Sequence, residues 1–416
     1  MEINVNDSGE PLNLYQAHIS DVVNKLLRQW GQVVRNPATR RVMVKIVEQS
    51  LTDSLNLSRK RDNFPPGVND DRAALNLCLL RTAERTLLEY DFSERTLECL
   101  LGVLIRDQLV NKKARKEKER AFSGTYGLAQ PSFLMINPTP PGHKTQEEST
   151  VSGLDWLTFD RVIAEAKNLW GAHLVLITGD DPLVYCSSGK NILDLAEKHP
   201  DVFFVISVDA NSAGNETCCR IKNLGNLSPV LQIPSSTDLH DCIPVMQRFH
   251  KMSIPFGVLL TATRDNAETL LAEPVINAIF KDQHALYGLV SPCALNGMPV
   301  QLNDIPTPQQ RLWLWRRSQE FIRKEGALLI DFWNYNTLTG GCLAGGGCGY
   351  GGYFYIDWKG DVSPCVLMPY AAANLKQIYA KGESLNDIWS MPLFARIREW
   401  QQTQCKDNLL TSCLFW

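Results

Sequence analysis

From about residue 130 onward, short apolar runs alternate with amphipathic helical segments, and this alternation restricts the possible folds more than any other feature of the chain. Candidate strands lie at residues 132–137, 173–178, 202–208, 229–233, 256–263 and 285–291. Candidate helices lie at residues 158–170, 191–198, 215–223, 237–252, 267–280 and 308–324. Strands that are separated by helical crossovers pair in parallel, with the helices outside the sheet. The pattern therefore predicts an α/β fold in which six such units form an open, partial barrel.

The chain before the first candidate strand has a helical pattern, from about residue 14 to residue 120. Amphipathic segments are found at residues 17–34, 41–55 and 71–90, and a further helix opens near Asp91 and runs through Val110. The tract at 112–120 mixes Lys, Arg and Glu, so we interpret it as a solvated helix end or linker. We therefore expect a helical N-terminal region over residues 1–128, followed by the barrel over residues 129–326.

The charge balance argues against a polyanionic partner. The chain has 42 Lys and Arg residues against 45 Asp and Glu residues, a formal net charge of -3, whereas nucleic-acid binding favours a basic surface. The N-terminus is acidic where a signal peptide is basic, and no apolar run approaches the roughly 18 residues of a membrane helix. We therefore expect a cytoplasmic protein that binds neither nucleic acid nor a membrane. In that compartment its 12 cysteines are not expected to form a disulfide framework.

Two of the loops that follow candidate strands carry polar residues of interest. Ligands bind at the C-terminal ends of the strands in parallel α/β folds. The second strand is followed by Gly179, Asp180, Asp181 and Pro182, and the fifth strand is followed by Arg264. Arg264 is a candidate to bind a carboxylate through two hydrogen bonds, with a structural salt bridge as the alternative. The two aspartates form a carboxylate pair that is a candidate for acid/base chemistry, with capping of a helix start as the alternative.

A glycine-rich stretch near the C-terminus carries several thiols. A final apolar run at residues 327–334 leads into T-G-G-C-L-A-G-G-G-C-G-Y-G-G, which contains Cys342 and Cys348, and Cys365 follows in G-D-V-S-P-C. Glycines let the backbone approach a ligand closely and adopt positive φ. Thiols on such loops can converge on one point, so the stretch at residues 339–369 is a candidate metal or cluster pocket, within a C-terminal domain that we expect over residues 327–416.

Several of these motifs, taken in order, are similar to those of a known family. The first strand is followed by P-T, then by the helix T-F-D-R-V-I-A-E-A-K and a strand ending in T-G-D-D-P-L. G-C-L-A-G-G, G-D-V-S-P-C and S-L-N-D-I-W-S-M-P-L-F come later. This order resembles the radical S-adenosylmethionine (radical SAM) enzymes with a C-terminal SPASM-type domain, over roughly residues 130–413. The resemblance implies a radical SAM-type partial (β/α)6 barrel with a helical N-terminal region and a small SPASM-like domain.

The resemblance also implies a SAM-cleaving centre, but this chain departs from the family at that site. Family members hold a [4Fe-4S] cluster with C-x3-C-x2-C directly after the first strand, and this cluster cleaves SAM to a 5′-deoxyadenosyl radical. The corresponding loop, residues 138–151, contains no cysteine, and we interpret its His143 as an ordinary loop histidine. The family's G-G-E-P loop binds the SAM amino group, but here Asp180 replaces Gly and Asp181 replaces Glu. Residues 233–238 also lack the acidic residue expected near the SAM ribose. These departures argue against SAM binding, although Gly179, Asp180, Asp181, Pro182 and Arg264 remain the candidate cofactor-binding residues.

The C-terminal cysteines fit one of the two clusters that the family motif can hold. The auxiliary motif begins C-x(9 to 15)-G-x4-C, which Cys348 fits by spacing and Cys342 fits by local sequence, with Cys365 as the second ligand. Cys405 and Cys413 complete a four-thiolate set. Thiolates bind iron–sulfur clusters and zinc equally well on ligand chemistry alone, and unmetallated thiols are a third alternative. The resemblance favours one auxiliary [4Fe-4S] cluster.

Two functional hypotheses follow, and no catalytic residue is assigned in either. In the first, the chain is a radical SAM/SPASM pseudoenzyme that has lost the SAM-cleaving site and acts as a binding or partner subunit. Its expected partner is a peptide or an active radical SAM homologue. In the second, it is an enzyme that modifies a peptide or small molecule by using SAM or an iron–sulfur cluster through non-standard ligands. The missing cysteine triad favours the first hypothesis.

Overall fold

The computed structural model describes residues 66–101, 112–127, 130–142, 153–233, 239–292, 302–331, 353–368 and 370–404, with a few single positions between residues 36 and 56. Its centre is a sheet in which parallel strands follow one another in chain order. These strands are β1 (Leu134–Ile136), β2 (Leu174–Ile177), β3 (Phe203–Val208), β4 (Leu227–Ile233), β5 (Gly257–Ala262), β6 (Tyr287–Pro292) and β7 (Leu328–Asp331). The predicted parallel α/β architecture is confirmed, and the apolar run at 327–334 adds β7 to the same sheet.

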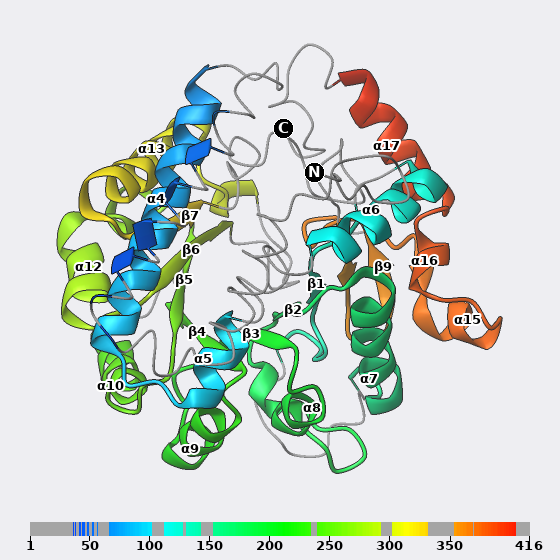
Figure 1. The fold of residues 1–416 in the computed structure, drawn as a ribbon, viewed down its shortest axis with the longest axis horizontal. Coiled ribbons are helices and arrows are strands. Elements are labelled where there is room, and N and C mark those ends of the chain that lie inside the picture. Colours follow the sequence, from blue (N-terminus) through cyan, green and yellow to red (C-terminus); the bar gives the residue numbers. More distant parts are fainter. Residues whose placement is uncertain are drawn as a thin grey trace, which may run out of the picture.

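Helices cover the outer face of the curved sheet, as Figure 1 shows. They are α7 (Trp156–Glu165), α8 (Ile192–Lys198), α9 (Asn215–Leu224), α10 (Leu239–Lys251), α11 (Ala267–Leu270), α12 (Glu273–Asn277) and α13 (Pro308–Glu320). Alternate strand residues such as Ile136, Ile177 and Ile206 are fully buried beneath them in the main core. Since side chains alternate between the two faces of a strand, the residues between them face the inside of the curve.

The prediction of a single helix at residues 267–280 is wrong. The segment divides into α11, α12 and a π-helical turn at Ala278–Asp282. Pro274 lies in the first turn of α12, and Ala272 before it is extended, with φ -65° and ψ 145°. A proline has no backbone N–H to donate to the carbonyl four residues earlier, and its ring clashes with that carbonyl, so Pro274 disfavours a continuous helix and α12 begins as a new one.

A short hairpin from the C-terminal part of the chain extends the sheet beyond β1. Strand β8 (Tyr355–Ile356) pairs in parallel with β1, and β9 (Asp361–Ser363) and β10 (Ala373–Asn374) add antiparallel strands outside it. The order is β10-β9-β8-β1 and then β2 through β7. The hairpin is followed by α15 (Leu375–Ala380), α16 (Leu385–Ile388) and α17 (Pro392–Gln404). The C-terminal thiol-bearing part of the chain is therefore joined directly to the first barrel strand.

The N-terminal helices lie against two different parts of the barrel (Figure 1). Helix α4 (Pro66–Glu89) packs through Cys78 on Ile322 and Leu328, near β7. Helix α5 (Glu94–Leu101) follows it. Helix α6 (Lys112–Tyr126) contains the charged tract. The ring of its Phe122 packs edge-on against the Trp389 ring, with the ring centroids 6.1 Å apart. The tract is thus the first half of a helix whose second half anchors it to the C-terminal region.

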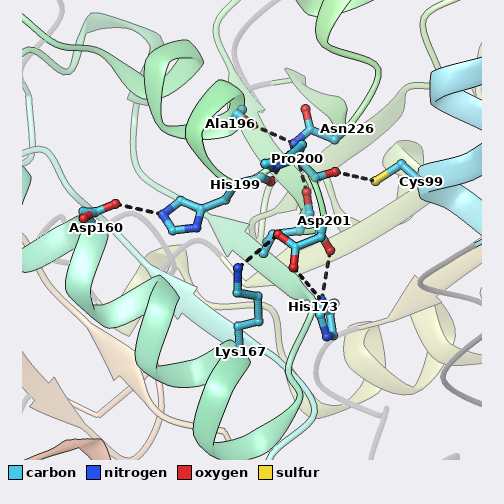
Figure 2. Close-up of polar contacts among 10 residues, drawn as sticks. Cys99, Asp160, Lys167, His173, Ala196, His199, Pro200, Asp201 and Asn226 are labelled. Atoms are coloured by element: carbon cyan, nitrogen blue, oxygen red, sulfur yellow. Dashed lines mark hydrogen bonds and ion pairs between the residues drawn. The ribbon is translucent and has the colours of Figure 1, made fainter. Parts of the chain in front are cut away.

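A polar cluster joins the segments that enter β2, β3 and β4, at the N-terminal edge of the sheet (Figure 2). The Asn226 amide nitrogen donates to the carbonyl oxygens of Ala196, His199 and Val202 at 2.9, 3.1 and 3.0 Å. The buried His199 ring lies 2.9 Å from Asp160 on α7. Burial lowers the pKa of His199. This cluster fixes the starts of the strands and leaves the opposite edge for ligand-binding loops.

Candidate functional site

Polar side chains gather on the inner face at the C-terminal ends of β1 to β4. Asn137 follows β1, Ser207 lies near the end of β3, and Gln232 lies near the end of β4. Their neighbours Ile136, Ile206, Val208, Leu231 and Ile233 all belong to the main core on the outer face. Alternation therefore directs the three polar side chains inward. They surround the loop 179–182 that follows β2, which is one of the two loops that the sequence singled out.

Gly179 brings this loop into close contact with the end of β1. Its φ is +126°, a conformation that residues with side chains rarely adopt. A Cβ atom at this position would lie 2.5 Å from the Asn137 Oδ1 atom. The Asn137 Oδ1 atom also accepts a hydrogen bond from the Thr139 backbone N–H at 3.2 Å. Glycine is therefore required here both by the backbone conformation and by the approach of Asn137.

Asp181 is buried and serves as a cap. Its Oδ1 accepts from the Leu183 N–H at 3.3 Å, at the start of the 3₁₀ helix Pro182–Val184, and its Oδ2 accepts from the Ser212 hydroxyl. Burial raises the pKa of Asp181, and the nearby Asp209 carboxylate acts in the same direction. The structure thus places Asp181 and Pro182 in the helix-start arrangement that the sequence offered as the alternative.

Asp180 and Gln232 connect the same loop to its neighbours. The Asp180 Oδ2 atom accepts from the Gly142 N–H at 2.6 Å, which ties this loop to the loop that follows β1. The Gln232 amide nitrogen donates to the carbonyl oxygens of Gly179 and Asp180 at 2.8 and 2.7 Å, and to the Ser207 hydroxyl at 2.7 Å. The carbonyl oxygens of Gly179 and Asp180, one carboxylate oxygen of Asp180 and both of Asp181 therefore already have partners within the chain.

Arg264 lies at the same edge of the sheet, after β5, and contacts the segment that leads to α13. Its Nε donates to the Ile305 carbonyl at 3.1 Å, and its backbone N–H donates to the Asp304 carbonyl at 2.9 Å. Gln310 donates to the Arg264 carbonyl at 2.9 Å. These hydrogen bonds hold Arg264 against the segment that precedes α13 and against α13 itself.

Cys365 is buried on the inner face beside the first strands. It shares a small apolar cluster with Met135, Tyr353 and Tyr355, against which Leu176 packs. The Tyr353 hydroxyl lies 3.4 Å from the Cys365 Sγ atom. The predicted ligands Cys342, Cys348, Cys405 and Cys413, and the loop residue His143, lie outside the described residues. In the part of the chain that is described, no three His, Cys, Asp or Glu side chains are arranged to hold a metal ion.

Tyr355 links the thiol region to the strand-end loops. This residue lies on β8 in the same cluster as Cys365, and the Asn137 side chain is close enough to its hydroxyl to oppose the effect of burial on its pKa. Burial raises the pKa of Tyr355 to about 12, so the hydroxyl remains protonated at neutral pH. Sequence reasoning missed Asn137 and Gln232. The available signal was a polar residue at an inward-facing position of an apolar strand, as in P-V-L-Q-I.

Comparison with known proteins identifies the C-terminal domain and the fold. Residues 348–413 match the SPASM family, an iron-sulfur cluster-binding domain, which implies an iron–sulfur cluster for this segment. No curated protein sequence matches the chain. No helix in the described ranges has both the length and the apolar character needed to cross a membrane.

Solved structures of similar fold include SuiB from Streptococcus suis. The structure of SuiB bound to S-adenosylmethionine is 16% identical, with a TM-score of 0.53, and the match covers 83% of this chain and 87% of SuiB. SuiB bound to its precursor peptide SuiA is 14% identical, with a TM-score of 0.50, covering 79% of this chain and 83% of SuiB. AnSMEcpe with bound AdoMet is 13% identical, with a TM-score of 0.47, covering 68% of this chain and 85% of that protein. The fold is accordingly an α/β partial barrel of the radical SAM type with N-terminal helices and a C-terminal SPASM domain.

Proposed function

We propose that this chain is a radical SAM/SPASM-type protein that does not cleave SAM and acts as a binding or partner subunit with one C-terminal iron–sulfur site. The observation that carries the proposal is that residues 138–151, the loop after β1, contain no cysteine. Three thiolates cannot be replaced by the single His143 of this loop. Without them no cluster with an open iron can form there, and an electron has no route to SAM.

The contacts of the loop 179–182 support the same conclusion. Asp181, which occupies the position of the family's glutamate, is buried and accepts hydrogen bonds from Ser212 and Leu183. Asp180 is held by Gly142. The residues that the resemblance assigns to SAM are thus engaged in holding the strand ends together, and they do not fit the cofactor.

The C-terminal thiols fit a cluster better. Cys365 is buried among apolar and aromatic side chains, an environment that keeps water from a thiolate-bound cluster. The SPASM match begins at residue 348 and ends at residue 413, which favours Cys348 over Cys342 as the first ligand. We therefore assign Cys348, Cys365, Cys405 and Cys413 as the ligand set. When bound there, a cluster would supply a structural or electron-transfer centre.

The proposed partner is a peptide or an active homologue. SuiB, which shares the fold, has been crystallised with the precursor peptide SuiA. A chain that keeps the barrel and the SPASM domain but not the SAM-cleaving cysteines retains a scaffold for binding such a peptide. A peptide encoded beside this gene is the ligand to titrate. Binding that leaves the peptide mass unchanged supports a binding subunit, whereas a change in mass contradicts the proposal.

The decisive test is 5′-deoxyadenosine formation. The protein is purified anaerobically, reconstituted with iron and sulfide, reduced in the presence of SAM, and compared with an intact radical SAM enzyme treated identically. No 5′-deoxyadenosine above background is expected, and sustained production would contradict the proposal. For the metal site, Cys348→Ser is expected to lower the iron content, while the matched Cys342→Ser variant retains it. The reverse pattern would refute the ligand assignment.

A further inference from the structure

Gln232 makes contacts that a strand residue does not need for the sheet itself. Its carboxamide nitrogen carries two hydrogens, yet three oxygen atoms lie within 2.8 Å of it: the carbonyls of Gly179 and Asp180 and the Ser207 hydroxyl. The carboxamide therefore reaches across β3 from β4 to the loop after β2. It joins three consecutive strand ends at one point.

The oxygens around this nitrogen form a site with a definite chemical preference. Two carbonyls and a hydroxyl oxygen converge on it, and the same loop carries the carboxylates of Asp180 and Asp181. Such a group of acceptors favours a donor with several N–H bonds and a positive charge, of which a primary ammonium is the simplest. The neutral carboxamide of Gln232 occupies the same position without a charge, and its two N–H bonds can serve two of the three oxygens at once.

We propose that Gln232 is an internal ligand of the loop 179–182, whose carboxamide takes the acceptors that the ammonium group of a bound SAM would need. On this reading, SAM is excluded by an added side-chain contact as well as by missing cysteines. The inference deepens the proposed function but rests on separate evidence, since it depends on the contacts of Gln232 and not on the loop at 138–151.

The first arm of the test removes the donor but keeps the shape. Gln232→Glu places a carboxylate oxygen against the carbonyls of Gly179 and Asp180, so the melting temperature is expected to fall at pH 7.5. The loss is expected to shrink toward pH 5, because the acceptors raise the pKa of the introduced carboxyl and its protonated form again donates one hydrogen bond. Gln377 is exposed on α15, so Gln377→Glu serves as the matched control and is expected to change stability little at either pH. If Gln232→Glu is as stable as the wild type at both pH values, the proposal is overturned.

The second arm opens the site and offers it a small ligand. In Gln232→Ala, methylammonium chloride is expected to raise the melting temperature more than tetramethylammonium chloride does, since only the former has N–H donors. The wild type and Gln377→Ala are expected to respond equally to the two salts. An equal response of Gln232→Ala to both salts, or a selective response of the wild type, would overturn the proposal. This arm decides the question even if Gln232→Glu does not fold.

The two proposals fail in distinguishable ways. Production of 5′-deoxyadenosine by the wild type would contradict the proposed function, whatever the ammonium response of Gln232→Ala. Loss of the selective ammonium response would contradict the role of Gln232, whatever the outcome of the cleavage assay. Equilibrium dialysis with labelled SAM adds a direct measurement. Gln232→Ala is expected to retain more SAM than the wild type, and tighter retention by the wild type would count against the role of Gln232.

Discussion

Replacing Asn226 by alanine is expected to destabilise the fold by about 2–6 kcal/mol. The side chain is fully buried, and its nitrogen donates to the carbonyls of Ala196, His199 and Val202 (Figure 2). The His199 carbonyl also accepts a hydrogen bond from the Val202 N–H at 3.1 Å. The loss of the Asn226 donor therefore affects mainly the carbonyls of Ala196 and Val202. A buried polar group that loses its partner costs roughly 1–3 kcal/mol, which gives the stated range for two.

The variant Asn226→Asp keeps the volume of the side chain but removes its N–H donors, so it separates the effect of the lost hydrogen bonds from the effect of the lost volume. A carboxylate would face carbonyl oxygens in a buried site, so the pKa of the introduced carboxyl is raised in the folded state. A group whose folded pKa is raised contributes stability at low pH that is lost as the pH rises. The penalty is therefore expected to grow by about 1.4 kcal/mol per pH unit between the unfolded pKa, about 3.9, and the folded pKa.

The assay is urea unfolding followed by tryptophan fluorescence, with free energies from linear extrapolation. The exposed Asn223 on α9 supplies the matched control, and Asn223→Ala is expected to lie within about 0.5 kcal/mol of the wild type. The reasoning would be refuted if Asn226→Ala were as stable as Asn223→Ala. It would also be refuted if the stability of Asn226→Asp showed the same pH dependence as that of the wild type.

Two further predictions concern a glycine and a histidine. Gly179→Ala is expected to lower the free energy of unfolding by about 1–3 kcal/mol for the positive φ alone, with a further loss because Asn137 must move. If urea unfolding shows that the variant is as stable as the wild type, this prediction is contradicted. His250 stacks on His284 with ring centroids 4.2 Å apart. Burial lowers the pKa of His250 and the His284 ring adds to this, while Glu89 opposes it. Because the unfolded chain then binds the proton more readily, stability is expected to fall as the pH drops through the unfolded value of about 6.5. His250→Asn is expected to flatten this fall in thermal unfolding at pH 7.5 and 5.5, and an unchanged slope would contradict the assignment.

The strand pattern was predictable because each strand of the barrel is an apolar run between helices. The runs at 202–208 and 256–263 became β3 and β5 with boundaries shifted by at most one residue. A short aromatic strand before Gly360 was predictable from the sequence, but its pairing with β1 was not. Strand β8 has two residues, and β1 lies more than 200 residues away in the sequence, so no local periodicity indicates the pairing. The break at Pro274 could have been foreseen from the properties of proline.

The candidate site was predictable in position but not in its contacts. The order of strands and loops located Gly179 to Pro182 at the ligand-binding edge, because parallel strands end on the same side of a sheet. That Asp181 would be buried against Ser212, and that Gln232 would reach its loop, depends on contacts across three strands. Spacing alone also did not show that Cys365 lies beside Met135 on the inner face.

The central claim is that the chain keeps one thiolate site and lacks the SAM-cleaving centre. Iron content and the electron paramagnetic resonance spectrum of the reduced, reconstituted protein test it most directly. The prediction is about four iron atoms per chain for a single [4Fe-4S] cluster, loss of this iron in Cys365→Ser, and a spectrum that SAM does not change. About eight iron atoms per chain, or a spectrum that shifts when SAM is added, would contradict the account.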